Sequence, residues 1–213
     1  MKEIAIITGG NSAEYEISIK SANVVMKNLD KKKYKPTIIN IKNDNWFTEL
    51  EGKKIEVNKE DFSIEHMGKK IIFDFVFMAL HGSPAENGEI QPYFDNLNLK
   101  YSSCTAKVSS LTFNKSDCNK KLSSFGFICA TYYSFLEGDK INTSEIIEKV
   151  GLPCFVKPNQ AGSSFGISKV KQESEMETAI KFALKHDNKV LIEQFIDGTE
   201  VSCGVMVLNN EIT

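Results

Sequence analysis

The chain has 213 residues, of which 41% are hydrophobic and 25% are charged, and its 26 basic and 28 acidic residues give a formal net charge of −2. This composition is typical of a folded globular protein and excludes a collagen-like, low-complexity or disordered chain. The length is enough for one large domain or two small ones. Because the charge is close to neutral, the sequence lacks the basic surface typical of nucleic-acid-binding proteins, so we expect no nucleic-acid partner.

The basic residues and the cysteines further restrict the class of protein. All 26 basic residues are Lys, which means either that the genome favours Lys, Asn and Ile codons or that a required Arg lies outside this chain. The five cysteines are odd in number and widely spaced, which disfavours a disulfide framework or a structural zinc site. No apolar run is long enough for a signal segment or a membrane span. We therefore expect a cytoplasmic protein with reduced thiols and no membrane partner.

The N-terminal half alternates apolar runs with amphipathic stretches, as in an α/β chain whose open sheet is largely parallel. Residues 4–8 are continuously apolar, which predicts a strand buried on both faces that ends at Gly9 and Gly10. The other expected elements are a helix from Asn11 or Ser12 to Leu29, strands over 34–41 and 71–80 separated by a polar excursion over 42–70, a glycine-bearing loop over 81–88, and a helix over 89–96. We expect this first domain to end near residue 100.

The second half continues with shorter elements. The expected ones are two helices over 105–125 joined near 114–115, strands over 131–135 and 152–157, a helix over 143–150, a loop over 157–166, a strand over 167–170, a helix over 173–186, and strands over 190–196 and 200–208 with a turn at 197–198. Asn209-Asn210 is a hairpin-turn signal close to the last residue, Thr213, so we expect a partial sequence.

One segment of the second half suits a phosphate group. Residues 162–166 are Gly-Ser-Ser-Phe-Gly, in which small residues let backbone N–H groups approach an anion and two hydroxyls add donors. Lys157 ends an apolar strand five residues earlier and would place a cation beside the same anion. The sequence has no Walker A motif, and a plain β-turn is the alternative.

Five other residues could belong to a site, and each has a simpler explanation. Lys115 lies at a helix junction and can be a solvated lysine, and Glu193 and Glu200 can be solvated acids near a strand end. His81, after a buried strand, is either a ligand contact or general acid, or a structural histidine. Glu14 is either a helix-start acid favoured by the helix dipole or a residue that faces the His81 loop. Glu14 can face the His81 loop because Glu14 and His81 both follow the carboxyl ends of strands.

Three groups of motifs resemble the D-alanine:D-alanine ligase family of ATP-grasp enzymes. They are GGNSAEYEIS at residues 9–18, ALHG at 79–82 with ENG at 86–88, and LPCFVKP at 152–158 with GSSFGISKV at 162–170. The resemblance spans residues 3–213 in the family's order. It implies an N-terminal α/β substrate-binding domain over 1–100, a central α+β ATP-grasp subdomain over 101–188 and the start of an incomplete C-terminal subdomain over 189–213.

The resemblance also implies a reaction. ATP phosphorylates the carboxylate of one D-alanine, and the amine of a second D-alanine attacks the acyl phosphate to give the dipeptide used in peptidoglycan. Mg²⁺ or Mn²⁺ is the implied metal, ATP and D-alanine are the implied partners, and a homodimer is the default assembly of a soluble enzyme. Such phosphoryl transfer depends more on positioning and charge neutralisation than on covalent chemistry by the protein.

The family's site residues carry over to matching positions of this sequence. Those implied for ATP are Lys115, Lys157, Gly162, Ser163, Ser164 and Gly166 at the phosphates, Glu193, Gln194, Phe195 and Ile196 at the adenine, and Glu200 at the ribose. Those implied for the first D-alanine are Glu14, Ile17, His81 and Ser163. Glu14 would meet the ammonium and order the loop through Ser163, so these two are the expected catalytic residues.

The sequence also departs from the family. Ala161 stands where many members carry an acid, Asn114 where an aspartate is common and Gln194 where a lysine is frequent, which implies an altered nucleotide affinity at most. The family's metal-binding acids, its oxyanion-stabilising arginine and most of its second D-alanine site correspond to positions beyond Thr213. We therefore expect no metal site in this chain and no catalysis by it alone. The alternatives are a non-catalytic ligand-binding fragment or paralogue, or a ligase that joins D-alanine to D-lactate or D-serine.

Overall fold

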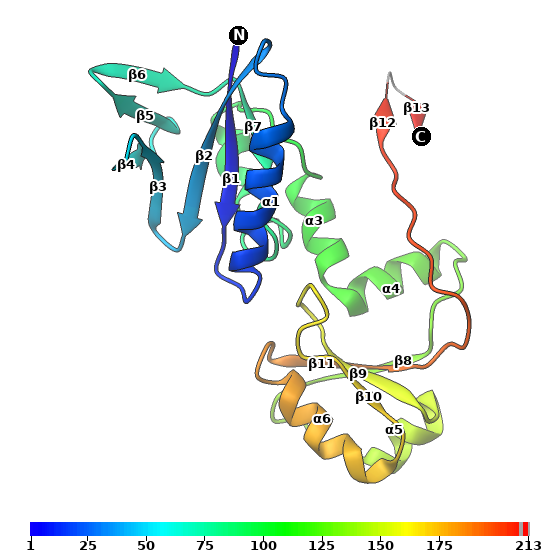
Figure 1. Ribbon diagram of the computed structural model, residues 1–213. Coiled ribbons are helices and arrows are strands. Elements are labelled where there is room, and N and C mark those ends of the chain that lie inside the picture. The colour runs from blue at the N-terminus through cyan, green and yellow to red at the C-terminus, as the bar shows by residue number, and fades with distance from the viewer. Residues whose placement is uncertain (209–210, 213) are drawn as a thin grey trace.

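Figure 1 shows the computed structural model, which describes residues 1–208 and 211–212. The predicted turn at Asn209 and Asn210 lies outside the described residues, as does Thr213. Two separate sheets lie at opposite ends of the folded part, and helices α3 (Ala106–Phe113) and α4 (Lys115–Ser124) lie between them (Figure 1). The predicted α/β class is confirmed.

The first sheet has seven strands in the order β6-β5-β4-β3-β2-β1-β7. Strand β1 (Lys2–Gly9) runs parallel to β2 (Tyr34–Lys42) and β7 (Phe75–Met78). Side chains cover both faces of β1: Ile6 clusters with Ala22 of helix α1 (Tyr15–Asn28), and Ile7 belongs to the larger core that includes Phe94 of helix α2 (Gln91–Asn96). This burial explains the continuous apolar run of β1, and the predicted opening βα unit is confirmed.

The prediction that residues 42–70 form a mostly polar stretch without strands is wrong. This stretch forms four antiparallel strands, β3 (Asn45–Leu50), β4 (Lys53–Asn58), β5 (Ser63–His66) and β6 (Lys69–Ile72). Buried residues such as Thr48, Val57 and Ile64 are sparse among exposed lysines and glutamates, so the alternation typical of strands is weak in the sequence. The sheet is therefore mixed, and its parallel part is confined to β2, β1 and β7.

The second sheet has four antiparallel strands in the order β10-β9-β11-β8. They are β8 (Tyr132–Leu136), β9 (Cys154–Pro158), β10 (Ser168–Val170) and β11 (Lys189–Gln194). Helices α5 (Thr143–Val150) and α6 (Met176–Ala183) cover one face of this sheet (Figure 1), and the 3₁₀ turn η1 (Glu173–Glu175) leads directly into α6. Ile146 of α5 and Ile180 of α6 pack there with Val156 and Ile192 of the strands. The opposite face looks toward α4 and the first sheet.

Three other predicted elements differ from the structure. The strand expected over 71–80 is broken, because the side chain of Asp74 accepts the backbone N–H of Glu3 at 2.8 Å between β6 and β7. The helix expected over 173–186 ends at Ala183. The strand expected over 200–208 is wrong: residues 199–206 are irregular and largely exposed, and only β12 (Val207–Leu208) pairs, with β13 (Glu211–Ile212).

Two further features concern the described chain as a whole. Within residues 1–208 and 211–212, no helix combines the length and the apolar character needed to span a lipid bilayer. All five cysteines are free thiols. The domain limits at residues 100 and 188 stay predictions, and β11, just after the second limit, pairs with β8 and β9 of the second sheet.

Candidate active site

Glu14 is placed by the turn that ends β1. Gly9 and Gly10 adopt φ angles of +94° and +101°, and a Cβ at Gly9 would lie 2.6 Å from the carbonyl oxygen of Ile41, so only glycine fits this turn. The chain then enters α1 at Glu14, whose backbone N–H donates to Ser12 Oγ at 3.2 Å. Only 3% of Glu14 is exposed, which makes it a buried acid at the start of a helix.

The Glu14 carboxylate connects the two halves of the molecule. Ser163, 149 residues later in the chain, donates its hydroxyl hydrogen bond to Glu14 Oε1. A Cβ at Gly162 would lie 2.7 Å from the carboxylate, and one at Gly82 would lie 2.9 Å from it, so two glycines leave the space that the carboxylate fills. The predicted proximity of Glu14, the His81 loop and Ser163 is thus present in the structure.

His81 is held by α1. Its backbone N–H donates to Ser18 Oγ at 2.9 Å, its Nε2 lies 2.9 Å from Ser21 Oγ, and its Nδ1 lies 3.7 Å from Glu86. Ser18 in turn donates to the backbone carbonyl of Glu14 at 3.2 Å, which links the two predicted site residues through one side chain. Ile17, 37% exposed, lies three residues after Glu14 on the same helix.

Two lysines lie near the segment we call the glycine loop, residues 160–166, and one of them contacts it. Lys115, the first residue of α4, donates from Nζ to the backbone carbonyl of Ala161 at 2.6 Å. Burial, and next the charge of Lys157, lower the pKa of Lys115. Lys157 lies on β9 and forms an ion pair with Glu193 on the neighbouring strand β11. Two ammonium groups and the loop's backbone and hydroxyl donors can together bind a polyanion such as a chain of phosphates.

The remaining predicted residues are only partly brought together. Glu193 also accepts from Asn119 Nδ2 at 3.4 Å, and Phe195 lies 6.0 Å from Phe155, ring centre to ring centre. Gln194 and Ile196 are exposed at the end of β11. Glu200 is exposed in the irregular segment, and none of the hydrogen bonds or ion pairs found among residues 1–208 and 211–212 involves it.

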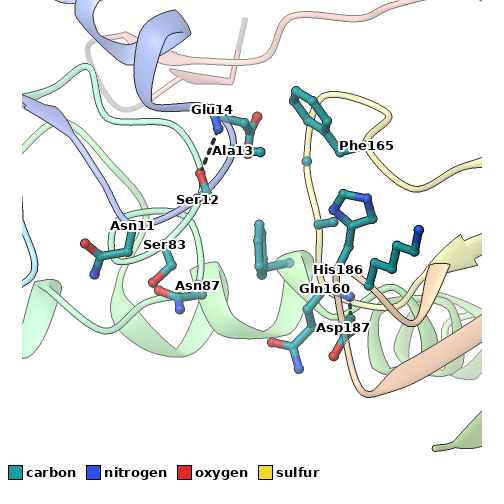
Figure 2. Close-up of a pocket in the computed structure, with 14 residues that line it drawn as sticks. Asn11, Ser12, Ala13, Glu14, Ser83, Asn87, Gln160, Phe165, His186 and Asp187 are labelled. Atoms are coloured by element: carbon teal, nitrogen blue, oxygen red, sulfur yellow. Dashed lines mark hydrogen bonds between the residues drawn. The ribbon is translucent and has the colours of Figure 1, made fainter. Parts of the chain in front are cut away.

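A polar cavity of about 400 Å³ opens beside the Glu14 and Ser163 contact. Figure 2 shows Asn11, Ser83 and Asn87 on one wall and Phe165, His186 and Asp187 on the other. Sequence reasoning missed the role of this second wall: His186 and Asp187 follow α6 in a short polar stretch without a recognisable motif. Asp187 Oδ2 accepts the backbone N–H of Gln160 at 2.6 Å, which anchors the start of the glycine loop.

The part of the chain that the structure describes contains no cluster of metal-binding side chains. Among its His, Cys, Asp and Glu side chains, no three come close enough to hold an ion. The groups that do converge are ammonium groups and hydroxyls, which donate hydrogen bonds to anions, and one buried carboxylate, which can accept from an ammonium group.

Comparison with known proteins identifies relatives along the whole chain. Two family models match it, D-ala D-ala ligase N-terminus over residues 3–104 and D-ala D-ala ligase C-terminus over residues 122–213. The chain is 51% identical over 213 residues to a D-alanine–D-alanine ligase of Flavobacterium johnsoniae, covering 100% of this chain and 66% of that protein.

Solved structures give the same result. The VanG D-Ala:D-Ser ligase of Enterococcus faecalis is 31% identical with a TM-score of 0.83, over 100% of this chain and 67% of that one. A D-alanine–D-alanine ligase of Bacillus anthracis, solved in complex with ATP, is 28% identical with a TM-score of 0.72, over 93% of this chain and 61% of that one.

The chain thus spans 66% of the length of its Flavobacterium johnsoniae relative, just under two thirds. The Glu14 and Ser163 contact joins the two matched regions: Glu14 lies in the N-terminal one and Ser163 in the C-terminal one. Sequence and fold agree, and the chain belongs to the D-alanine–D-alanine ligase family.

Proposed function

We propose that this chain forms the N-terminal and central parts of an ATP-dependent ligase that joins two D-alanines for peptidoglycan synthesis. The observation that carries the proposal is the Glu14 and Ser163 contact, because it joins a buried acid to the loop that Lys115 contacts and that follows Lys157 on β9. A site that couples an amino acid to ATP needs an acid for an ammonium group and cations for phosphates within reach of one another.

On the nucleotide side, we assign Lys115 and Lys157 to the ATP phosphates and Gly162, Ser163, Ser164 and Gly166 to the loop that covers them. The lowered pKa of Lys115 supports this assignment, since a half-buried lysine beside a second lysine gains most from an incoming anion. Glu193 with Gln194, Phe195 and Ile196 is assigned to the adenine and Glu200 to the ribose, on the family resemblance alone.

On the amino-acid side, Glu14 takes the ammonium of the first D-alanine, with His81, Ile17 and Ser163 around it. The carboxylate oxygen of this D-alanine attacks the γ-phosphorus of ATP, and ADP leaves. The amine of the second D-alanine then attacks the acyl carbon, loses a proton and expels inorganic phosphate. The residues of this chain bind and orient the reactants and neutralise charge in both steps.

The reaction's metal is Mg²⁺ or Mn²⁺, which neutralises phosphate charge when bound. We place its ligands in the part that the longer relatives possess in addition to this chain. A cytoplasmic location, which the five free thiols support, and a homodimeric assembly belong to the same proposal.

A second candidate is a ligase that joins D-alanine to D-serine or D-lactate. The 31% identical D-Ala:D-Ser ligase favours it. The choice depends on the second substrate, and the residues assigned above concern ATP and the first.

The test is product analysis with the full-length protein. Incubation with ATP, Mg²⁺ and D-alanine should release inorganic phosphate and form D-alanyl-D-alanine, with parallel reactions that add D-serine or D-lactate. A mixed product formed in preference to the dipeptide would establish the second candidate. Folded full-length protein that makes no product from any of these substrates would contradict the proposal and favour a non-catalytic paralogue.

A further inference from the structure

The turn between α6 and β11 contacts both ends of the glycine loop. At the start of the loop, Asp187 Oδ2 accepts the N–H of Gln160 at 2.6 Å, and Asp187 Oδ1 accepts the N–H of Lys189 at 3.3 Å. The side chain of Asp187 therefore ties the loop to the first residue of β11.

His186, the preceding residue, contacts the end of the loop. Its ring centre lies 6.4 Å from that of Phe165 in the loop and 5.5 Å from that of Phe182 on α6. A Cβ at Gly166 would lie 2.7 Å from Cδ2 of His186 and 3.0 Å from Pro158, and Gly166 is buried at a φ of +72°. The glycine thus lets the imidazole lie directly against the backbone where the loop ends.

Between these two anchors the loop forms hydrogen bonds with Glu14, through Ser163, and with Lys115, through Ala161. Ser163, Ser164 and Phe165 are exposed, and both serines adopt left-handed φ angles of +45° and +58°. This conformation is unfavourable for residues other than glycine and persists only when neighbouring contacts hold it. The loop's contacts with Glu14 and Lys115, at Ser163 and Ala161, therefore depend on how firmly its two ends are held.

We propose that His186 and Asp187 are positioning residues that clamp the glycine loop over the nucleotide phosphates. This inference rests on the proposed function. His186 holds the end of the loop by ring contact with Phe165 and Gly166, and Asp187 holds its start by the hydrogen bond to Gln160 (Figure 2). Neither residue touches the reacting atoms.

The kinetic test compares His186→Ala and His186→Phe in the full-length protein, with His66→Ala as the matched control. His66 lies at the end of β5 in the first sheet. His186→Ala should raise the KM for ATP by about tenfold, because a displaced loop contacts the phosphates poorly. His186→Phe keeps the ring contact and should restore the KM to within about twofold of wild type. His66→Ala should leave it unchanged.

A second measurement does not depend on activity. Chymotrypsin cuts after phenylalanine, so a loosened loop should be cut faster between Phe165 and Gly166 in His186→Ala of this chain, with the site identified by mass spectrometry. Should His186→Ala fail to fold, Phe165→Ala removes the same contact from the loop side and should raise the KM for ATP equally.

The outcomes separate the clamp from the function on which it rests. An active wild type whose His186→Ala and Phe165→Ala variants keep a normal KM for ATP overturns the clamp, whatever their rate of cleavage. An inactive, folded full-length wild type contradicts the proposed function. In that case, equal rates of chymotrypsin cleavage in wild type and His186→Ala contradict the proposed clamp. Faster cleavage of the variant supports the proposal that His186 holds the glycine loop in place.

Discussion

At the scale of single residues, the most informative group is the Glu14 carboxylate. It is buried, and Ser163 is the one residue whose side chain donates to it among the described hydrogen bonds. A carboxylate has about four acceptor positions. Glu14 therefore has acceptor capacity left for an ammonium ligand, which a carboxylate with a purely structural role in a helix cap would not need.

Glu14→Gln should raise the KM for the first D-alanine by about tenfold or more and leave the KM for ATP within about twofold, because a neutral amide loses the charge that attracts the ammonium. Steady-state kinetics with each substrate varied separately measures both constants. Glu16→Gln, an exposed acid in the first turn of the same helix, is the control. Equal effects on the two constants would indicate that Glu14 only stabilises the helix start.

Lys157 has two expected roles, since it pairs with Glu193 on the neighbouring strand. Lys157→Ala should weaken ATP binding by about tenfold or more through loss of a charged contact. It should also lower the melting temperature by leaving the half-buried Glu193 without its cation. Calorimetric ATP titration and thermal unfolding measure these effects, with Lys181→Ala at an exposed helix pair as the control. Unchanged ATP affinity would refute the assignment of Lys157.

The lowered pKa of Lys115 predicts that the stability of the folded protein depends on pH. Its folded pKa lies below the ordinary 10.5, mainly through burial, so keeping it charged costs the folded state free energy at neutral pH. That cost disappears as the pH rises from the lowered pKa to 10.5, because the folded chain releases its proton first. The stability of Lys115→Met relative to wild type should therefore be greatest at pH 7 and fall toward pH 10.5. Urea unfolding at both pH values tests this, and a stability difference independent of pH would contradict it.

At the scale of elements, the glycine loop depends on small residues at chosen points. Gly162→Ala would place a Cβ 2.7 Å from the Glu14 carboxylate, so either the acid or the loop must move. The variant should raise the KM values for both ATP and D-alanine by about tenfold. Gly198→Ala is the matched control, because nothing lies within 4 Å of its Cβ position. Wild-type kinetics in Gly162→Ala would show that the contact between Glu14 and the loop is dispensable.

Elements with strong local signals were predictable from the sequence. Strand β1 has a continuous apolar run because it is buried on both faces, and α5 has Asn142 at its start and Gly151 at its end. Strands β3 to β6 were missed because one face of this part of the sheet is solvated and its buried residues are few. The prediction of a strand over 200–208 was wrong for the opposite reason. The segment contains apolar residues, but over 199–206 they have no partner strand in the described chain.

At the scale of the whole molecule, the candidate site lies where the two sheets approach each other. Sequence patterns alone indicated a phosphate loop with Lys157 and raised Lys115, Glu193, Glu14 and His81 as candidates, and the family resemblance gave these candidates their roles. Neither approach could find His186 and Asp187, because their significance lies in contacts with residues 160–166 that only the folded chain brings about. Glu200 remains a prediction from the resemblance.

In the proposed function, one site transfers phosphate from ATP to a D-alanine carboxylate. The most direct test incubates the full-length protein with ATP, Mg²⁺ and D-alanine labelled with ¹⁸O in its carboxylate, and then analyses the products by mass spectrometry. In an acyl-phosphate mechanism, one labelled oxygen leaves with each inorganic phosphate when the second amine attacks. We predict one ¹⁸O in the phosphate for each dipeptide formed. Unlabelled phosphate, or label in AMP, would contradict the account.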